Sequence, residues 1–168
     1  MLTNQMHPDQ KVGVFVDVSN MYYSAKNLHN SKVDFGQVLQ MVLGKRKLIR
    51  AFAYVIRANI EQEKTFFEAL EKRGFEVRIK DLQVFLGGEK KGDWDVGLCM
   101  DAVRLIPKID ALVLISGDGD YTDLLDYARS QGVRCEVASF GRNTSGKLIE
   151  RADSFFDLDY FAKNILLA

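Results

Sequence analysis

Residues 12–20 read VGVFVDVSN, a continuous apolar run that contains one carboxylate, Asp17, and ends in two small polar residues. A strand covered by helices on both faces has this composition, whereas a half-exposed strand alternates apolar and polar residues. Strand-like and helix-like stretches then alternate along the chain, which predicts right-handed β–α–β connections. We therefore expect an α/β fold, a three-layer α/β/α Rossmann-like sandwich with a mainly parallel sheet of about five strands.

The other expected elements follow from hydrophobic periodicity and from the positions of glycine and proline. Strands are expected at residues 12–18, 48–56, 75–79, 111–115 and 133–138, with 82–86 as a continuation of the third after a break. Helices are expected at residues 21–28, 35–43, 61–73, 94–106, 121–130, 146–152 and 158–167. Residues 1–10 are polar and contain Pro8, which predicts a flexible leader before a single domain at 11–168.

The composition is that of an ordinary globular protein, with 47% hydrophobic and 27% charged residues. Lys+Arg and Asp+Glu both number 23, so the net charge is zero, which argues against a protein that coats nucleic acid by bulk charge. A net charge of zero is still compatible with an enzyme that binds nucleic acid through a local basic patch. We see no signal-peptide pattern and no apolar stretch near the roughly 20 residues that span a bilayer, so we expect a cytoplasmic protein without membrane contact.

Cysteine and histidine chemistry has little support. Cys99 and Cys135 lack metal-ligand spacing and lie in apolar stretches, so we expect two reduced, buried thiols. The two histidines are His7, in the polar leader, and His29, at an expected helix end. This placement disfavours a zinc site or a histidine-based catalytic triad.

Three aspartates stand where expected strands end. Asp17 closes the first strand, and Asp118 and Asp120 directly follow the strand at 111–115. The carboxyl ends of parallel strands share one edge of the sheet, so Asp17 and Asp118 converge if their strands are neighbours. Gathered carboxylates need a counterion, and a hard divalent cation such as Mg²⁺ or Mn²⁺ prefers oxygen ligands. Alternatively, each aspartate is only a helix cap or a turn residue.

The helix expected at 94–106 adds a further carboxylate, Asp95. At about 100° per residue, Gly97, Asp101 and Arg104 share a polar face of that helix. Asp95 falls on the opposite, apolar side, where a carboxylate is costly unless it is paired or bound to metal. Helical phase therefore favours Asp95 over Asp101 as a site residue. Asp101 and Arg104 are expected to form a solvated ion pair.

Polar and basic residues near the same edge are candidates for binding a substrate. Asn20 and Ser116 are placed to orient a carboxylate, a water or a phosphate, although turn formation explains each of them equally well. Lys91, before the helix at 94–106, and Arg142, after the fifth strand, are candidates for binding phosphate, with a solvated loop as the alternative.

Two other groups of residues have simpler explanations. The run KRK at 45–47 and Arg50 begin the second strand, at the opposite edge of the sheet, and are expected to serve solubility. Tyr22 and Tyr23 offer rings for stacking on bases or for a dimer face, but packing in the core is the expected outcome.

Three stretches carry recognisable motifs, in this order along the chain: VFVDVSN at residues 14–20, KGDWDVGL at 91–98 and LISGDGDY at 114–121. Together they resemble the NYN domain, specifically the LabA-like group of the PIN-like nuclease superfamily. The segment at 148–159 also fits this group. The resemblance covers about residues 11–160.

The resemblance implies a PIN-like fold and a metal-dependent ribonuclease site. Matched position by position, it makes Asp17, Asp95 and Asp118 the acids that hold Mg²⁺ or Mn²⁺. It makes Asp120 an accessory acid and Asn20 the characteristic asparagine of the first motif.

Two features do not fit the resemblance simply. Asp101 matches a recurring acid of the group, which conflicts with the argument from helical phase, and we keep it secondary. Many PIN enzymes also carry an acid on an early helix, and here Asp34 and Glu61 are candidates without further support.

The primary hypothesis is a metal-dependent endoribonuclease that hydrolyses phosphodiester bonds, with single-stranded RNA as its substrate. The alternative is a catalytically inactive RNA- or protein-binding regulatory module of the same fold, which the absent early-helix acid and the neutral charge favour. A homodimer is left open. A haloacid-dehalogenase phosphatase is disfavoured because Asp17 is not followed by an acid two residues later, and a dinucleotide enzyme because no glycine-rich loop follows the first strand.

Overall fold

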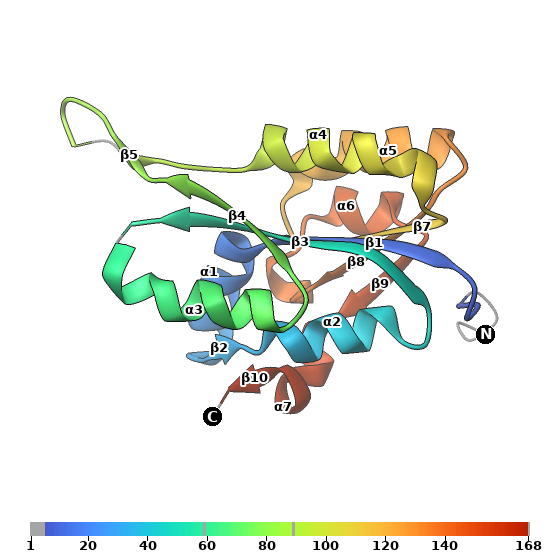
Figure 1. Cartoon of the computed structure of the whole chain (residues 1–168), viewed down its shortest axis with the longest axis horizontal. Helices are drawn as coiled ribbons and strands as arrows, with labels where there is room; N and C mark the ends of the chain where they lie inside the picture. Colours follow the sequence, from blue (N-terminus) through green and yellow to red (C-terminus); the bar gives the residue numbers. More distant parts are fainter. Residues whose placement is uncertain (1–5, 59, 89, 168) are drawn as a thin grey trace.

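The computed structural model describes residues 6–58, 60–88 and 90–167, and Figure 1 shows a central sheet between two layers of helices. Six parallel strands form the sheet in the order β4-β3-β1-β7-β8-β9. Their bounds are β1 Lys11–Asp17, β3 Lys47–Arg57, β4 Glu76–Asp81, β7 Ala111–Ile115, β8 Arg134–Ser139 and β9 Ser154–Asp157. The expected α/β/α sandwich with a mainly parallel sheet is therefore confirmed.

Helices cover both faces of the sheet (Figure 1). One layer holds α1 (Val18–His29), α2 (Phe35–Leu43), α3 (Ile60–Lys72) and α7 (Ala162–Ile165), and the other holds α4 (Asp95–Leu105), α5 (Thr122–Ser130) and α6 (Gly146–Arg151). Four short 3₁₀ segments adjoin them in the described ranges: η2 (Ile106–Lys108), η3 (Gly119–Tyr121), η4 (Gly141–Asn143) and η5 (Leu158–Phe161). None of the helices in the described part of the chain is long and apolar enough to cross a membrane.

Two small antiparallel pairs lie outside the central sheet. β2 (Lys32–Val33) pairs with β10 (Leu166–Leu167), and β5 (Gln83–Val84) pairs with β6 (Lys90–Lys91). The second pair extends beyond the sheet as an arm between β4 and α4 (Figure 1).

The side chains of β1 alternate between two hydrophobic cores. Val14 and Val16 are fully buried in one core, with Met21 of α1. Phe15 is fully buried in the other, with Leu98 of α4. Because helices cover both faces, neither face of β1 tolerates polar residues, which is why the run at 12–16 shows no polar alternation.

The carboxyl-terminal part differs most from the expected elements. A single helix was expected at residues 158–167, whereas the structure has η5, α7 and β10 there. β9 is a sixth strand that the pattern does not reveal, because its four residues are only half-buried. Residues 1–5 of the expected leader lie outside the described residues. The last residue of that leader, Gln10, is bonded to the domain, because its carbonyl accepts a hydrogen bond from the Lys47 N–H.

Both cysteines are free thiols, but they differ in burial. Cys135 is buried as expected, while Cys99 is only half-buried. Burial raises the pKa of the Cys99 thiol to about 11 and that of Cys135 to about 12. Neither side chain is a thiolate near neutral pH, so both are poor nucleophiles.

Arg46 forms a buried ion pair with Glu136 of β8, and the expectation that it serves solubility is wrong. Its two terminal nitrogens lie 2.7 and 2.9 Å from the two carboxylate oxygens, and both side chains are 1% exposed. Arg46 also donates to the carbonyls of Leu43 and Val42 and to the Gln10 side chain. It therefore fastens the turn before β3 to the sheet, which the charge pattern of residues 45–47 cannot reveal.

We expect Arg46→Met to lower the free energy of unfolding by about 3–5 kcal/mol, because Glu136 is then left buried without its main partner. Urea denaturation measures this loss. The matched control is Arg151→Met, which breaks the exposed Arg151–Asp126 pair and is expected to cost less than about 1 kcal/mol. Equal losses for the two variants would show that the buried pair has no special weight.

Candidate metal centre

The order of the strands brings two aspartate-bearing ends together. β1 and β7 are neighbours, and their parallel register runs to the pair Val16 and Ile115. The next residues, Asp17 on one side and Ser116 on the other, therefore leave the sheet side by side at its carboxyl edge. The chain fills the sheet to one side of this pair with β3 and β4 and to the other with β8 and β9, so this is a topological switch point.

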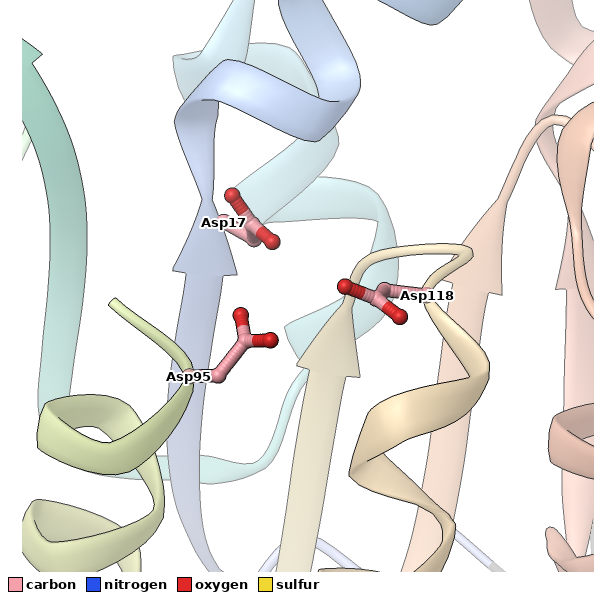
Figure 2. Close-up of side chains that lie close together, drawn as sticks. All are labelled: Asp17, Asp95 and Asp118. Carbon is pink, nitrogen blue, oxygen red and sulfur yellow. The ribbon is translucent and has the colours of Figure 1, made fainter. Parts of the chain in front are cut away.

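Asp17, Asp95 and Asp118 face one another across a small space. Figure 2 shows them at the end of β1, at the start of α4 and in the loop after β7. One carboxylate oxygen from each lies within 4.8 Å of the other two. The structure thus brings together the three carboxylates that the sequence proposes as metal ligands.

The two carboxylate oxygens of Asp17 have different tasks. Oδ1 accepts the backbone N–H of Asn20 at 3.2 Å, so the side chain caps α1. Oδ2 accepts from the hydroxyls of Ser116 and Tyr121, each at 3.3 Å. Asp17 therefore is a helix cap and also one of the three neighbouring carboxylates, and its binding of a metal stays a prediction.

Asn20 and Ser116 hold the two strand ends in a fixed relation. The Asn20 side-chain oxygen accepts the Gly117 N–H at 3.0 Å and so connects the first turn of α1 to the loop after β7. The Ser116 hydroxyl donates to Asp17 and accepts the Asp118 N–H at 3.2 Å. Both residues lie beside the three carboxylates, where they orient carboxylate and backbone groups, and their part in substrate binding stays a prediction.

Tyr121 is a site residue that the sequence pattern did not single out. Its ring is fully buried, and its hydroxyl lies 3.3 Å from Asp17 Oδ2 and 3.1 Å from Asp95 Oδ1. A hydroxyl carries one hydrogen, so the two carboxylates share this donor. The available signal was a tyrosine inside the third motif, since a buried tyrosine hydroxyl needs a polar partner.

Burial and mutual repulsion disfavour the charged forms of Asp17 and Asp95. Burial, together with the charges of Asp95 and Asp118, raises the pKa of Asp17 to about 6, against the lowering effect of its hydrogen bonds to Asn20 and Tyr121. Burial, followed by the charge of Asp118, also raises the pKa of Asp95. Among the described side chains, no lysine or arginine forms an ion pair with any of the three. The site therefore has excess negative charge that a cation can balance.

Asp120 lies next to the group of three and is exposed. Its N–H donates to Asp118 Oδ1 at 2.9 Å, and its side chain borders a groove of about 490 Å³ between α5 and α6. The groove is lined by Gly119, Asp120, Thr122, Asp123, Asp126, Lys147, Glu150 and Arg151. Asp120 is thus exposed beside the three carboxylates, and its charge contributes to the raised pKa of Asp95.

Asp101 belongs to a different cluster. Its carboxylate accepts from the Tyr54 hydroxyl at 3.0 Å and forms ion pairs with Arg78 and Arg104 at 3.5 and 3.3 Å. The expected pair with Arg104 is present, but it is not solvated on the aspartate side, because the Asp101 side chain is only 13% exposed. Tyr54 and Arg78 come from neighbouring strands, so helical phase alone could not show this burial.

The remaining candidates lie as follows. Arg142 binds Asp159 through two nitrogens, at 3.0 and 3.3 Å, and contacts His29, so a phosphate has to compete for its guanidinium. The Lys91 side chain lies outside the described residues. Tyr22 and Tyr23 are 41% and 61% exposed, so the expectation that they pack in the core is wrong. The rings of Tyr22 and Tyr23 pack against each other edge to face.

Comparison with known proteins gives one family and two informative relatives. The family model described as "NYN domain" matches residues 11–159. Low amplitude and bright protein LabA from Synechococcus elongatus is 25% identical over 157 residues, which cover 89% of this chain and 84% of LabA. The crystal structure of VPA0982, a protein of unknown function from Vibrio parahaemolyticus, has a TM-score of 0.86 and 33% identity, and covers 95% of this chain and 97% of that one.

The raised pKa of Asp17 predicts a pH dependence of stability in the absence of metal. Between the ordinary value of 3.8 and about 6, the folded chain keeps a proton that the unfolded chain releases. The contribution of Asp17 to the free energy of unfolding therefore falls as pH rises through this window. We expect urea denaturation in EDTA to show the wild type losing stability relative to Asp17→Asn as pH rises. A constant difference would contradict the raised pKa.

Tyr121→Phe removes the donor that Asp17 and Asp95 share. We expect the free energy of unfolding near pH 7 without metal to fall by about 1–3 kcal/mol, because two partly buried charges lose a hydrogen bond. The pKa of both carboxyls should rise further. Urea denaturation measures the loss, and Tyr127→Phe, at a 43% exposed tyrosine of α5, is the control with an expected change within about 0.5 kcal/mol. Equal effects of the two variants would contradict the role of the Tyr121 hydroxyl.

Proposed function

The chain belongs to the NYN domain family, and from this premise we propose that it is a metal-dependent ribonuclease that hydrolyses phosphodiester bonds in single-stranded RNA. The observation that carries the proposal is the group of Asp17, Asp95 and Asp118, with one oxygen of each within 4.8 Å of the others. Single-stranded RNA is favoured over duplex because a flexible strand bends more easily toward a partly buried cluster.

The residues present fit Mg²⁺ or Mn²⁺. All three donors are carboxylate oxygens, the ligands that hard divalent cations prefer. The three charges lie close together, and no described lysine or arginine side chain is paired with them. A divalent cation offsets the repulsion that raises the pKa of Asp17 and Asp95.

The chain's own residues have separate parts in this proposal. Asp17, Asp95 and Asp118 would hold the ion, which when bound supplies an activated water and neutralises charge on the phosphate. Ser116 and Tyr121 keep the Asp17 carboxylate in one orientation through their hydroxyls. Such outer hydrogen bonds fix the geometry of metal-binding groups before the substrate arrives.

Other polar residues would act around this centre. Asp120, which is exposed beside Asp118, is proposed to hold a water outside the group of three. Lys91 and Arg142 are proposed to steer phosphate, with Arg142 exchanging part of its contact with Asp159. No side chain acts as the nucleophile, in keeping with the raised pKa of both thiols.

The direct test is degradation of a labelled single-stranded RNA by the purified protein with Mn²⁺. We expect Asp17→Asn combined with Asp118→Asn to lower the rate by more than about a hundredfold. Mutation of a residue that only hydrogen-bonds to a metal ligand already lowers metal affinity or activity by about 10–100-fold, and these two residues are the proposed ligands themselves. Asp9→Asn, an exposed aspartate near Lys47 at the other end of the sheet, is the matched control and should leave the rate unchanged. Undiminished degradation by the double variant would rule out this site as the origin of activity.

Metal binding has its own readout. Mn²⁺ should raise the melting temperature of the wild type and leave that of the double variant nearly unchanged, because only a protein that binds the ion when folded gains stability from it. Binding of RNA without degradation, and without a shift in melting temperature, would instead identify the catalytically inactive binding module.

A further inference from the structure

At β3 and β4, one face of the sheet carries a group of exposed cations beside α4. α3 packs on one side of these strands, and on the other side α4 contacts them through Asp101, which binds the Tyr54 hydroxyl and Arg78. The arm of β5 and β6 extends beyond the start of α4 (Figure 1). Phe52 and Tyr54 of β3 point to this second side, with the core that includes α4. The strand register pairs Phe52 with Glu76 and Tyr54 with Arg78, so Arg78 and, two residues on, Lys80 share this face.

Four cations lie at this face, Arg50, Arg78 and Lys80 on the strands and Arg104 on α4, and we call them the cationic row. The guanidinium carbons of Arg50 and Arg78 lie 4.5 and 5.5 Å from the centre of the Phe52 ring. Phe52 is 1% exposed, so the two arginine side chains complete the cover of a ring that also belongs to the core with α4. The cations themselves stay accessible, since the Arg50, Arg78 and Arg104 side chains are 44%, 46% and 70% exposed.

The carboxylates within the row do not neutralise it. Glu76 accepts two hydrogen bonds from Arg50, and Asp101 pairs with both Arg78 and Arg104. Four cations therefore face two carboxylates. A guanidinium has five N–H donors, and Arg50 spends two of them on Glu76, so donors are left for a further anion.

The row leads to the metal centre. Lys80 Nζ lies 4.5 Å from the centre of the Trp94 ring and donates to the Asp93 carbonyl at 3.2 Å. Trp94 is fixed to β3 by a hydrogen bond from its ring nitrogen to the Val55 carbonyl at 2.8 Å, and it directly precedes Asp95. Arg78 and Lys80 are two residues apart on a strand, about 6.6 Å, which is comparable to the spacing of successive phosphates in an extended strand.

We propose that the cationic row binds the sugar–phosphate backbone of the single-stranded RNA that leaves the metal centre. The inference rests on the proposed function in taking RNA as the ligand. Charge complementarity and continuity with Asp95, through Lys80 and Trp94, support it. In a chain of zero net charge, such a local row supplies the attraction that bulk charge does not.

The test is the affinity of the full chain for a fluorescently labelled single-stranded RNA, measured by anisotropy in EDTA so that no metal-dependent cleavage interferes. We expect Lys80→Glu combined with Arg104→Glu to raise Kd by roughly tenfold or more. The dependence of log Kd on log salt concentration should become less steep by about 0.7 for each phosphate that the variant no longer neutralises. Lys80→Gln with Arg104→Gln should give a smaller change of the same sign.

The matched control is Lys108→Glu with Arg129→Glu. These exposed cations make the same change in charge, but they lie where η2 and α5 end, at the amino edge of the sheet. Melting temperatures of all variants check that each is folded. If a glutamate variant does not fold, the corresponding glutamine variant replaces it in the binding measurement. Equal weakening by row and control variants, no weakening by either, or no RNA binding by the wild type would overturn the inference.

The outcomes separate this inference from the proposed nuclease activity. If the row variants weaken binding but Mn²⁺ supports no RNA degradation by the wild type, the row stands as an RNA-binding surface and the nuclease proposal fails. If the wild type degrades RNA and the row variants bind it normally, the nuclease proposal stands and the row is only a cover for the aromatic side chains of β3.

Discussion

The parallel pairing of β1 with β7 is the constraint on which the candidate site depends. The register ends at Val16 and Ile115, so the chain leaves both strands at one edge and at one level. Asp17 then faces Asp118, and α4 brings Asp95 to the same space. Any other strand between β1 and β7 would separate the two aspartates by a further strand spacing of about 4.8 Å. The acids meet because the sheet places its two halves on opposite sides of this pair.

The same arrangement opposes stability locally. Three carboxylates that are partly withdrawn from water repel one another, and burial raises the pKa of Asp17 and Asp95. Hydrogen bonds donated by Ser116 and Tyr121 offset part of this cost. The two hydrophobic cores on either side of β1 stabilise the fold against what remains of it. The cation that we propose for this site would offset the remaining repulsion.

Charged residues have three distinct fates in this fold. Arg46 is paired with Glu136 in the interior, where it fastens a turn to the sheet. Asp17, Asp95 and Asp118 gather negative charge at the sheet edge. Cations such as Arg78 lie over an aromatic ring and keep their charge at the surface. A net charge of zero therefore hides a strongly uneven distribution, which bears on binding more directly than the total does.

The sequence by itself determined the class of fold, most strand and helix positions, and which three aspartates are candidates for one site, because these depend on local periodicity and on the rule that parallel strands end at one edge. The pairing of β1 with β7 decided that Asp17 and Asp118 meet. Helical phase selected Asp95 for the site, but the solvated face that it assigned to Asp101 is wrong, because Tyr54 and Arg78 cover that carboxylate. Only the tertiary structure decided which groups surround those aspartates. The hydroxyl of Tyr121, the burial of Arg46 against Glu136 and the contact of Arg78 with the Phe52 ring join residues far apart in the chain. Such contacts leave no periodic signal, since they arise when distant strands and helices pack together.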